Sequence, residues 1–306
     1  NQNVPYALIF GLAGLEMEAE QVVQFPSHLN DDELRLAMRY VPWELNGFPT
    51  WVENAYRDRP ELVSEAILQE LAWDLQREDA PRSYILHDIV YHAPWFHAHI
   101  ADWAIGWLEA NTARDADVLR QVIFIAKSTM DRNRLSALAR AKVEVQSPVG
   151  EQAKWFALWV DIDADNAVVR LEEWLRSLPP EEASTAAQHF LTELIGSRHN
   201  ETLGTAFNSY WTPEHLKHLF GLMNEHINAK DDINRAGSGV YSPGLRDNAQ
   251  DARDGLFKAL RDIPGKETYL ALRELSLSDA NASLRAWMLH LACERAEADG
   301  DLEDWS

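Results

Sequence analysis

The sequence predicts an all-α protein built from stacked antiparallel helix pairs, and three observations support this fold class. Helix-start signals recur along the chain, apolar stripes at a spacing of three and four residues follow them, and the alternating apolar patterns of strands are nearly absent. The 306 residues are 46% hydrophobic and 10% aromatic, which suits a large folded core rather than a disordered chain. We therefore expect more than half of the residues to be helical.

The first half of the chain contains several helix starts. Asn30-Asp31-Asp32-Glu33 has the form of a capping box, in which the Asn and Glu side chains each accept a hydrogen bond from the backbone N–H at the other position. Asp58-Arg59-Pro60-Glu61 repeats this arrangement. Residues 95–111 carry an apolar face at helical spacing, and residues 118–126 are apolar almost all round, which predicts a helix enclosed by its neighbours.

Helix signals continue through the second half. Thr212-Pro213 and Ser242-Pro243 each combine a capping side chain with a proline suited to the first helical residue, so a helix is expected to begin at each. The second of these helices ends before Pro264-Gly265 and is followed by an apolar stripe from Tyr269 to Leu277. Further helices are expected over 132–145, 151–161, 166–178, 180–197 and 213–228.

An internal repeat accompanies these helices near the end of the chain. The segment from Ala252 to Leu260 aligns with the segment from Leu284 to Ala292 at an offset of 32 residues, which suits one helix pair. Its Asp, Arg and apolar positions resemble the inner helix of HEAT-like repeats. We expect a HEAT-like α-solenoid, with a compact multi-helix bundle as the alternative. Residues 1–306 then form a single helical-repeat domain, with a sub-division near 146–148, at Ser147-Pro148, left open.

Strong negative charge limits the partners. The chain has 28 Lys and Arg against 49 Asp and Glu, a formal net charge of −21, so its long-range field repels phosphate backbones and anionic membranes. We expect neither nucleic acid nor a membrane as a partner. The single cysteine, Cys293, excludes an internal disulfide and lies in an apolar helical pattern, which predicts a buried thiol in a reducing cytoplasm.

The N-terminal segment is expected to be neither a signal peptide nor a membrane anchor. It lacks a basic region, and its apolar run from Ala7 to Leu15 is too short to span a bilayer. Because the chain begins abruptly, without Met and within a helix-like pattern, we expect the 306 residues to be part of a larger protein.

A histidine-rich segment, residues 87–102, is the first candidate for chemistry. It holds side chains that suit a metal ion, namely His87, Asp88, His92, His97, His99 and Asp102. Spacings of five residues, however, turn His87, His92 and His97 off a common helix face, and Pro94 interrupts the helix. We therefore predict no metal site here, but histidines at a seam between helices.

His87-Asp88 is also the dipeptide of the HD-type phosphohydrolases, helical enzymes that bind a metal through His, His-Asp and a distant Asp. The only upstream histidine is His28. The downstream carboxylates available to complete such a site are those of Asp161, Asp163 and Asp165. A metal-dependent hydrolase centred on this dipeptide is the alternative function.

The glycine-rich loop 237–244 leads into a helix start, where free backbone N–H groups can hold an anion. It is not a P-loop, because it has no Gly-Lys-Ser/Thr and no preceding strand. In one interpretation this loop contacts a ligand or partner through Arg235, Tyr241 and Arg246. In the other it is a connector in which Arg246 and Asp247 pair locally.

No catalytic pattern is found in the sequence. There is no Gly-x-Ser-x-Gly elbow and no HExxH motif, and Cys293 has no orienting third group to make it a nucleophile. His215 and His218 lie three apart on one helix face, and we expect them to be solvated or half-buried. The chain is therefore expected to contain no catalytic residue, no cofactor site and no enzymatic activity.

Two stretches resemble a known class of proteins. Residues 198–223, RHNETLGTAFNSYWTPEHLKHLFGLM, and residues 241–276, from YSPGLRDNAQDAR to ALRELS, look like the helical C-terminal region of large bacterial NTPases of the STAND/NACHT type. Those proteins are associated with antiphage defence. Their nucleotide-binding module lies N-terminal, and the helical-repeat region senses a phage component or holds the assembly inactive. This chain contains no Walker motif, so any NTPase activity would lie outside it.

The resemblance implies a non-catalytic sensor or scaffold that binds a protein partner, either a phage protein or other domains of the parent chain. Affinity would come from a helical surface with a few aromatic or Arg anchors. The predicted partner contacts lie in loops and at helix entries rather than on apolar stripes: Trp211, Arg235, Tyr241 and Arg246. A HEAT-like DNA glycosylase shares the architecture but needs a basic groove, which the charge of −21 disfavours.

Overall fold

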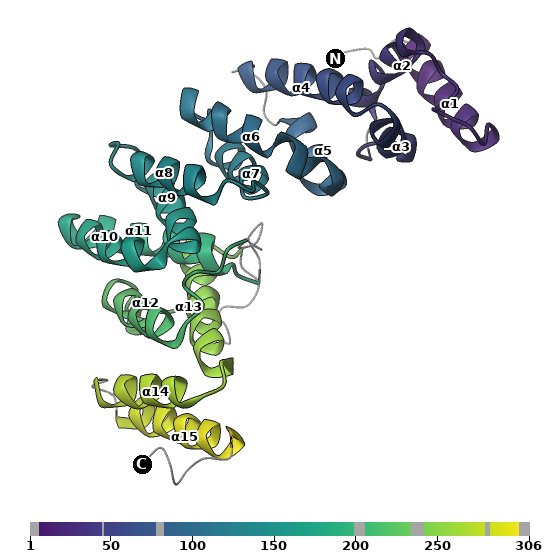
Figure 1. Ribbon diagram of the computed structural model, residues 1–306. Coiled ribbons are helices and arrows are strands. Elements are labelled where there is room, and N and C mark those ends of the chain that lie inside the picture. The colour runs from purple at the N-terminus through teal and green to yellow at the C-terminus, as the bar shows by residue number, and fades with distance from the viewer. Residues whose placement is uncertain are drawn as a thin grey trace. The chain divides into compact units, whose positions relative to one another are not determined.

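The chain is all-α, as the sequence predicts. A computed structural model describes residues 6–44, 46–77, 83–198, 206–233, 242–278 and 282–299, which form helices joined by short loops, without a strand among them (Figure 1). The chain divides into two compact units, residues 1–129 and 130–306. The division does not fall near 146–148, where Ser147-Pro148 lies between two neighbouring helices of the second unit. None of the described helices is both long enough and apolar enough to cross a membrane.

The first unit is organised around α4 and α5. Its helices are α1 (Tyr6–Gln21), α2 (Asp31–Met38), the 3₁₀ turn η1 (Val41–Trp43), α3 (Thr50–Asp58), α4 (Pro60–Gln76), α5 (Tyr84–His92), α6 (Pro94–Ala110) and α7 (Ala116–Ala126). α4 packs against α2, α3 and α5, while α5 packs against α6 and α7, which also contact each other. Wholly buried apolar side chains fill the space between them, among them Val52, Val63, Leu86, Ile89 and Phe96.

The second unit is a two-layered stack of helix pairs. Its helices are α8 (Arg132–Val143), α9 (Val149–Ile162), α10 (Ala164–Ser177), α11 (Pro180–Ile195), α12 (Pro213–His226), the 3₁₀ turn η2 (Ala229–Asp231), α13 (Leu245–Asp262), α14 (Lys266–Ser278) and α15 (Ala282–Asp299). One layer contains α9, α11 and α13 side by side, and the other contains α10, α12 and α14. Consecutive helices also pack as the pairs α8/α9, α10/α11, α12/α13 and α14/α15.

This layering is typical of α-solenoid repeats, because each pair buries its apolar stripes mainly against its own partner and the next pair. The internal repeat found in the sequence has a structural counterpart. Its two copies lie on α13 and α15, which are the second helices of successive pairs, and Phe257 of the first copy stacks on Trp287 of the second with ring centroids 5.1 Å apart.

Two predicted helix caps are formed. Asn30 Oδ1 accepts from the backbone N–H groups of Asp32 and Glu33, each at 3.0 Å, and the Glu33 carboxylate accepts from the Asn30 N–H at 2.8 Å. Thr212 Oγ1 accepts from the N–H of His215 at 3.2 Å. These caps satisfy backbone donors that a helix leaves free in its first turn.

Two other predicted caps are wrong. Asp58 is the last residue of α3, and α4 begins at Pro60 without a side-chain cap. α13 begins at Leu245 rather than at Ser242-Pro243, because the Asp247 carboxylate accepts from the Gly244 N–H at 3.1 Å and so fixes the start of the helix.

The burial predicted from the sequence agrees with the structure for α7 but not for the thiol of Cys293. In α7 no residue between 118 and 126 is exposed, as its composition predicts: the apolar side chains are buried on one face, and Arg120, Gln121 and Phe124 are half-buried. Cys293 is exposed, so the predicted buried thiol is wrong. The reason is the register of α15, whose buried stripe runs through Met288, Ala292 and Ala296 and leaves position 293 beside it.

The stability of the second unit is expected to depend on pH through His189 of α11. Burial, and secondarily the nearby Lys154 ammonium, lower the pKa of His189 despite the opposing Glu193 carboxylate. The folded state therefore binds fewer protons than the unfolded state, in which a histidine has a pKa of about 6.5. The stability contributed by the neutral imidazole is present above that pH and is lost as the pH falls below it, through the lowered pKa of the folded state.

Urea unfolding of the wild type and of His189→Gln between pH 7.5 and 5.5 measures this contribution. The wild type is expected to lose more free energy of unfolding over that range than the variant, which cannot take up the proton. Equal losses in the two proteins would contradict this assignment.

Candidate functional site

The structure describes two of the four predicted partner contacts, Trp211 and Arg246. Arg235 and Tyr241 lie outside the described residues, as does most of the glycine-rich loop between 233 and 242. Trp211 is 47% exposed, as expected of a contact residue. The side chain of Arg246 is 18% exposed and pairs with Asp232. Their roles in binding a partner stay predictions.

Arg246 belongs to a polar clamp that holds the chain after α12 against α13. Its Nη2 contacts Asp232 Oδ1 at 2.7 Å and donates to the Asn228 carbonyl. Arg253, two turns further along α13, pairs with the other oxygen of Asp232 and donates to the Ile227 carbonyl at 3.0 Å. We call Asp232, Arg246 and Arg253 the Asp232 clamp. It holds the described residues that precede the glycine-rich loop.

Trp211 is presented by a short segment that a buried carboxylate holds in place. Asp161, which is 0% exposed at the end of α9, accepts the backbone N–H groups of Ala206, Phe207 and Asn208 at 3.0, 3.3 and 2.8 Å. Asn208 has a φ of +52°, a left-handed conformation that Asn tolerates better than most residues. Trp211 therefore follows an anchored backbone segment and presents a large aromatic side chain at the surface.

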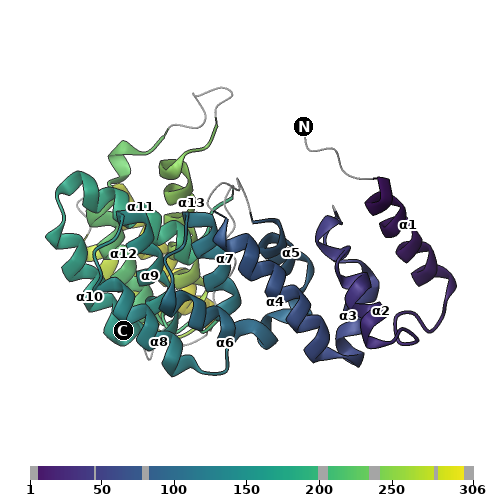
Figure 2. The same ribbon diagram turned by 90° about the horizontal axis from the view of Figure 1, so that it is seen from above.

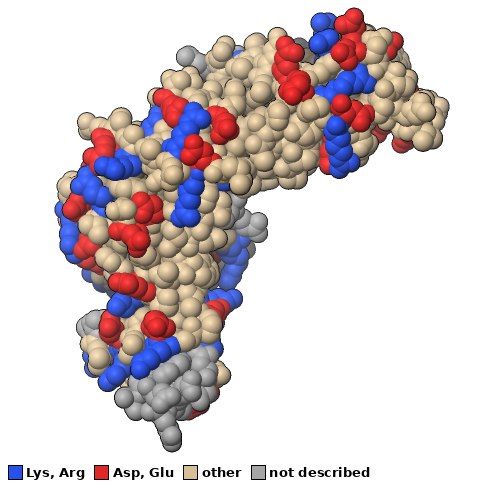
Figure 3. Space-filling model, in the orientation of Figure 1, with Lys and Arg blue, Asp and Glu red and all other residues tan. Residues whose placement is uncertain are grey.

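An apolar surface on α1 was not anticipated as a site. α1 contains no buried residue, and one of its faces carries Tyr6, Ile9, Phe10 and Met17, which are 80%, 50%, 72% and 57% exposed. These positions follow the spacing of a helical stripe, which we call the α1 stripe. Figures 1 and 2 place α1 at the edge of the first unit, and the region of α1 in Figure 3 is mainly tan. The signal available in the sequence was an apolar run with no polar face.

The opposite face of α1 covers the rest of its unit loosely. Leu12 and Leu15 line a hollow of about 380 Å³ together with Val41, Phe48 and Trp51. Gly11 touches the ring of Tyr40, and a side chain at position 11 would not fit there. α1 is thus apolar on both faces, with one face turned to its own unit and the other exposed. A helix of this kind is normally enclosed on two sides.

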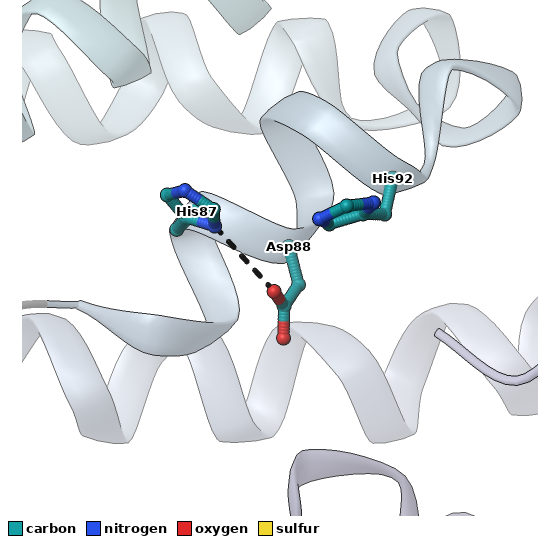
Figure 4. A group of neighbouring side chains, drawn as sticks. All are labelled: His87, Asp88 and His92. Carbon is teal, nitrogen blue, oxygen red and sulfur yellow. Dashed lines mark ion pairs between the residues drawn. The ribbon is translucent and has the colours of Figure 1, made fainter. Parts of the chain in front are cut away.

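The histidine-rich segment brings three side chains together, contrary to the prediction from spacing. The ligand atoms of His87, Asp88 and His92 lie within 4.8 Å of one another, and His87 Nδ1 is 3.5 Å from Asp88 Oδ1 (Figure 4). α5 ends at His92, and Asp88 is four residues before it on the same helix face. His87 reaches the same place because its ring turns toward its neighbour Asp88. We call these residues the α5 trio.

The other members of the segment have different roles. His97 is buried, with Nε2 2.8 Å from the Ile89 carbonyl, and so joins α6 to α5. His99 stacks on Phe96 and contacts Tyr56 edge to face. Asp102 accepts from the Thr129 hydroxyl at 3.1 Å. His97 and His99 thus lie at contacts between helices, as the sequence predicts.

Two groups outside α5 shape the α5 trio. Burial raises the pKa of Asp88, and although His87 and His92 oppose this shift, the nearby Glu44 carboxylate adds to it. Gly47 approaches so closely that a Cβ there would lie 2.5 Å from Cγ of His92. The backbone of the loop before α3 thus confines the His92 ring on one side. The trio is thus a half-buried carboxylate flanked by two exposed imidazoles.

Gly47→Ala is expected to destabilise the first unit. Gly47 has a φ of +90°, which costs a residue with a side chain about 1–3 kcal/mol, and the added methyl group would also displace His92. Gly14→Ala is the matched control, because a Cβ there meets nothing within 4 Å and Ala favours a helix by about 1 kcal/mol. Thermal unfolding of the two variants should shift in opposite directions. A Gly47→Ala protein as stable as the wild type would contradict this description.

The two histidines of α12 contact separate carboxylates of α10. His215 Nε2 lies 3.1 Å from Asp165, and His218 Nε2 lies 2.9 Å from Glu172. Glu172 also pairs with Arg176 at 2.6 Å along a groove of about 520 Å³ lined by α10, α12 and α14. The arrangement is a network of surface ion pairs that ties the helices of one layer together.

No family model matches the chain, and neither does any curated protein or solved structure.

Proposed function

We propose that this chain is a non-catalytic helical-repeat scaffold or sensor that binds a protein partner. The observation that carries the proposal is the α1 stripe, where Tyr6, Ile9, Phe10 and Met17 expose large apolar surfaces on one helix face. Contiguous exposed apolar patches mark interaction surfaces, since leaving them in water is unfavourable by roughly 25 cal/mol per Å². Trp211, which follows the backbone segment anchored by Asp161, provides a second exposed aromatic side chain.

The chemistry of α1 defines the kind of partner. Its sequence, YALIFGLAGLEMEAEQ, contains Glu16, Glu18 and Glu20 and no Lys or Arg. A protein groove that accepts this helix would have an apolar floor and basic side chains at its rim. A groove of this type accommodates both the stripe and the acidic end of α1.

The resemblance of residues 198–223 and 241–276 to STAND/NACHT-type NTPases supports a more specific role. We propose that the chain is the recognition part of such a protein in bacterial antiphage defence, that it works in the cytoplasm, and that its partner is a phage protein or another domain of the parent chain. The open reading frame tests this role. A nucleotide-binding P-loop module upstream of Asn1 is expected, and a start codon directly before Asn1 would count against it.

Co-purification from the source cells tests partner binding by the α1 stripe. A protein that accompanies the wild-type chain is expected to be lost with Ile9→Asp/Phe10→Asp. It should be retained with Val169→Asp, which changes an apolar side chain of similar exposure, 52%, on α10. A partner that binds all three proteins equally would show that the α1 stripe is not its binding surface.

An HD-type metal-dependent phosphohydrolase is the second candidate, favoured by the approach of His87, Asp88 and His92. The carboxylates considered for the distant ligand have other partners in the structure: Asp161 accepts backbone N–H groups, Asp163 contacts Asn166 and Asp165 contacts His215. Release of phosphate from a phosphomonoester by the wild type with added Mn²⁺, abolished by His87→Ala, would favour the hydrolase over the scaffold.

A further inference from the structure

Two imidazoles and a carboxylate converge at the C-terminal end of α5. The side-chain atoms of His87, Asp88 and His92 that can bind a metal lie within 4.8 Å of one another. Zinc is bound by histidine nitrogens at about 2.0–2.1 Å and by carboxylate oxygens at about 2.0–2.2 Å, so the ligands of a tetrahedral site are about 3.3 Å apart. The separation of 3.5 Å between His87 Nδ1 and Asp88 Oδ1 is already close to this value.

The surroundings of the α5 trio favour a cation. The Asp88 carboxylate is half-buried and lies near a second carboxylate, that of Glu44. Such a setting suits a divalent ion, because the ion neutralises carboxylates at short range. His87 and His92 supply nitrogen ligands, which suit zinc, whereas magnesium and calcium prefer oxygen ligands.

The His92 ring is also restricted before any ion binds. The close approach of Gly47 leaves no room for a side chain beside Cγ and Cβ of His92. Packing of this kind reduces the rotamer freedom that a ligand side chain would lose on binding. His87 and His92 are both exposed, so an ion can reach the trio from solvent.

We propose that His87, Asp88 and His92 form a binding site for one Zn²⁺ ion, with water in the fourth position of the tetrahedron. This inference is independent of the partner-binding function, which rests on α1. It also differs from the hydrolase hypothesis, since His92 replaces the distant ligands that an HD-type site requires. Three protein ligands leave one coordination position open to an outside donor.

Zinc titration of the full 306-residue chain, freed of metal with a chelator, tests the proposal. Competition with a fluorescent zinc chelator is expected to show one equivalent of bound Zn²⁺. His87→Ala, Asp88→Asn and His92→Ala should each weaken that binding by at least about tenfold. Co²⁺ should give an absorption spectrum of four-coordinate cobalt with the wild type, and this spectrum should be lost in the same variants.

Two histidine variants outside the trio serve as controls. His99→Ala removes a histidine of the same segment, and His290→Ala removes one that lies 3.2 Å from a carboxylate four residues away, Glu294. Both should bind zinc within about twofold of the wild type. Asp88→Asn keeps the shape of the side chain and is expected to fold. Its zinc affinity therefore tests the site even if an alanine variant does not fold. The proposal would be overturned if the wild type bound no stoichiometric Zn²⁺, or if Asp88→Asn bound zinc as tightly as the two control variants.

Discussion

Replacing Asp161 with Ala is expected to lower the free energy of unfolding of the second unit by about 3 kcal/mol or more. The carboxylate is fully buried and accepts three consecutive backbone N–H groups, at residues 206–208. Its loss would leave these donors without their acceptor and a space at the end of α9. Hydrogen bonds to a charged group contribute more than neutral ones, so this substitution should exceed most core truncations of similar volume.

Hydrogen exchange of the segment 206–212, together with urea unfolding, measures the effect. The amides of residues 206–208 should exchange faster in Asp161→Ala, and Asp161→Asn should lie between this variant and the wild type, since an amide oxygen still accepts. Asp165→Ala is the control, because the Asp165 side chain is 86% exposed and exposed pairs contribute at most about 1 kcal/mol. Equal stability of Asp161→Ala and Asp165→Ala would contradict the anchoring role of Asp161.

Replacing Asp232 with Ala is expected to cost about 3–5 kcal/mol. Asp232 is the shared counter-ion of Arg246 and Arg253, and the Arg253 side chain is only 9% exposed. Without the carboxylate, a buried guanidinium keeps its charge and loses its ion pair. The penalty arises mainly from that uncompensated charge rather than from the lost contact itself.

A double-mutant cycle separates these two causes. Arg253→Met in the Asp232→Ala background removes the unpaired charge and should recover a large part of the lost free energy of unfolding. Asp231→Ala, at an exposed neighbouring position, should change stability by less than about 0.5 kcal/mol. Additive effects of the Asp232 and Arg253 substitutions would show that the Asp232 clamp does not act as a unit.

The sequence predicted the helices well because their determinants are local. The capping box at Asn30, the cap at Thr212 and the prolines at positions 60, 94, 180 and 213 act within one helical turn. One of the two wrong caps shows the limit of this local reasoning. At α13, Asp247 reaches back to Gly244, so an acidic residue inside the helix determined its start rather than Ser242.

The site residues were harder to predict because they depend on contacts between distant segments. Asp161 binds backbone groups more than forty residues away, and nothing in its local pattern separates it from Asp163 or Asp165. The prediction that the histidine-rich segment holds no metal site rests on the five-residue spacings of its histidines and on Pro94. It does not include the adjacent pair of His87 with Asp88 or the four-residue step from Asp88 to His92, which bring the α5 trio together.

The exposure of the α1 stripe could not be predicted from composition, because an apolar run predicts burial without indicating what covers it. The helices α2 and α3 each bury one apolar face, whereas α1 has apolar residues on nearly every side and buries none of them. Only the structure shows that the face with Tyr6 and Phe10 is exposed.

Site-specific photo-crosslinking in the source cells tests the central claim most directly. A photoreactive amino acid replaces Phe10 in the α1 stripe, and in a matched control it replaces Arg57, whose side chain is 65% exposed on α3 of the same unit. A crosslinked adduct with one other protein, or with a domain of the parent polypeptide outside residues 1–306, is expected from position 10 and not from position 57. Absence of such an adduct at position 10, or identical adducts at both positions, would contradict the claim that this helical surface binds a protein partner.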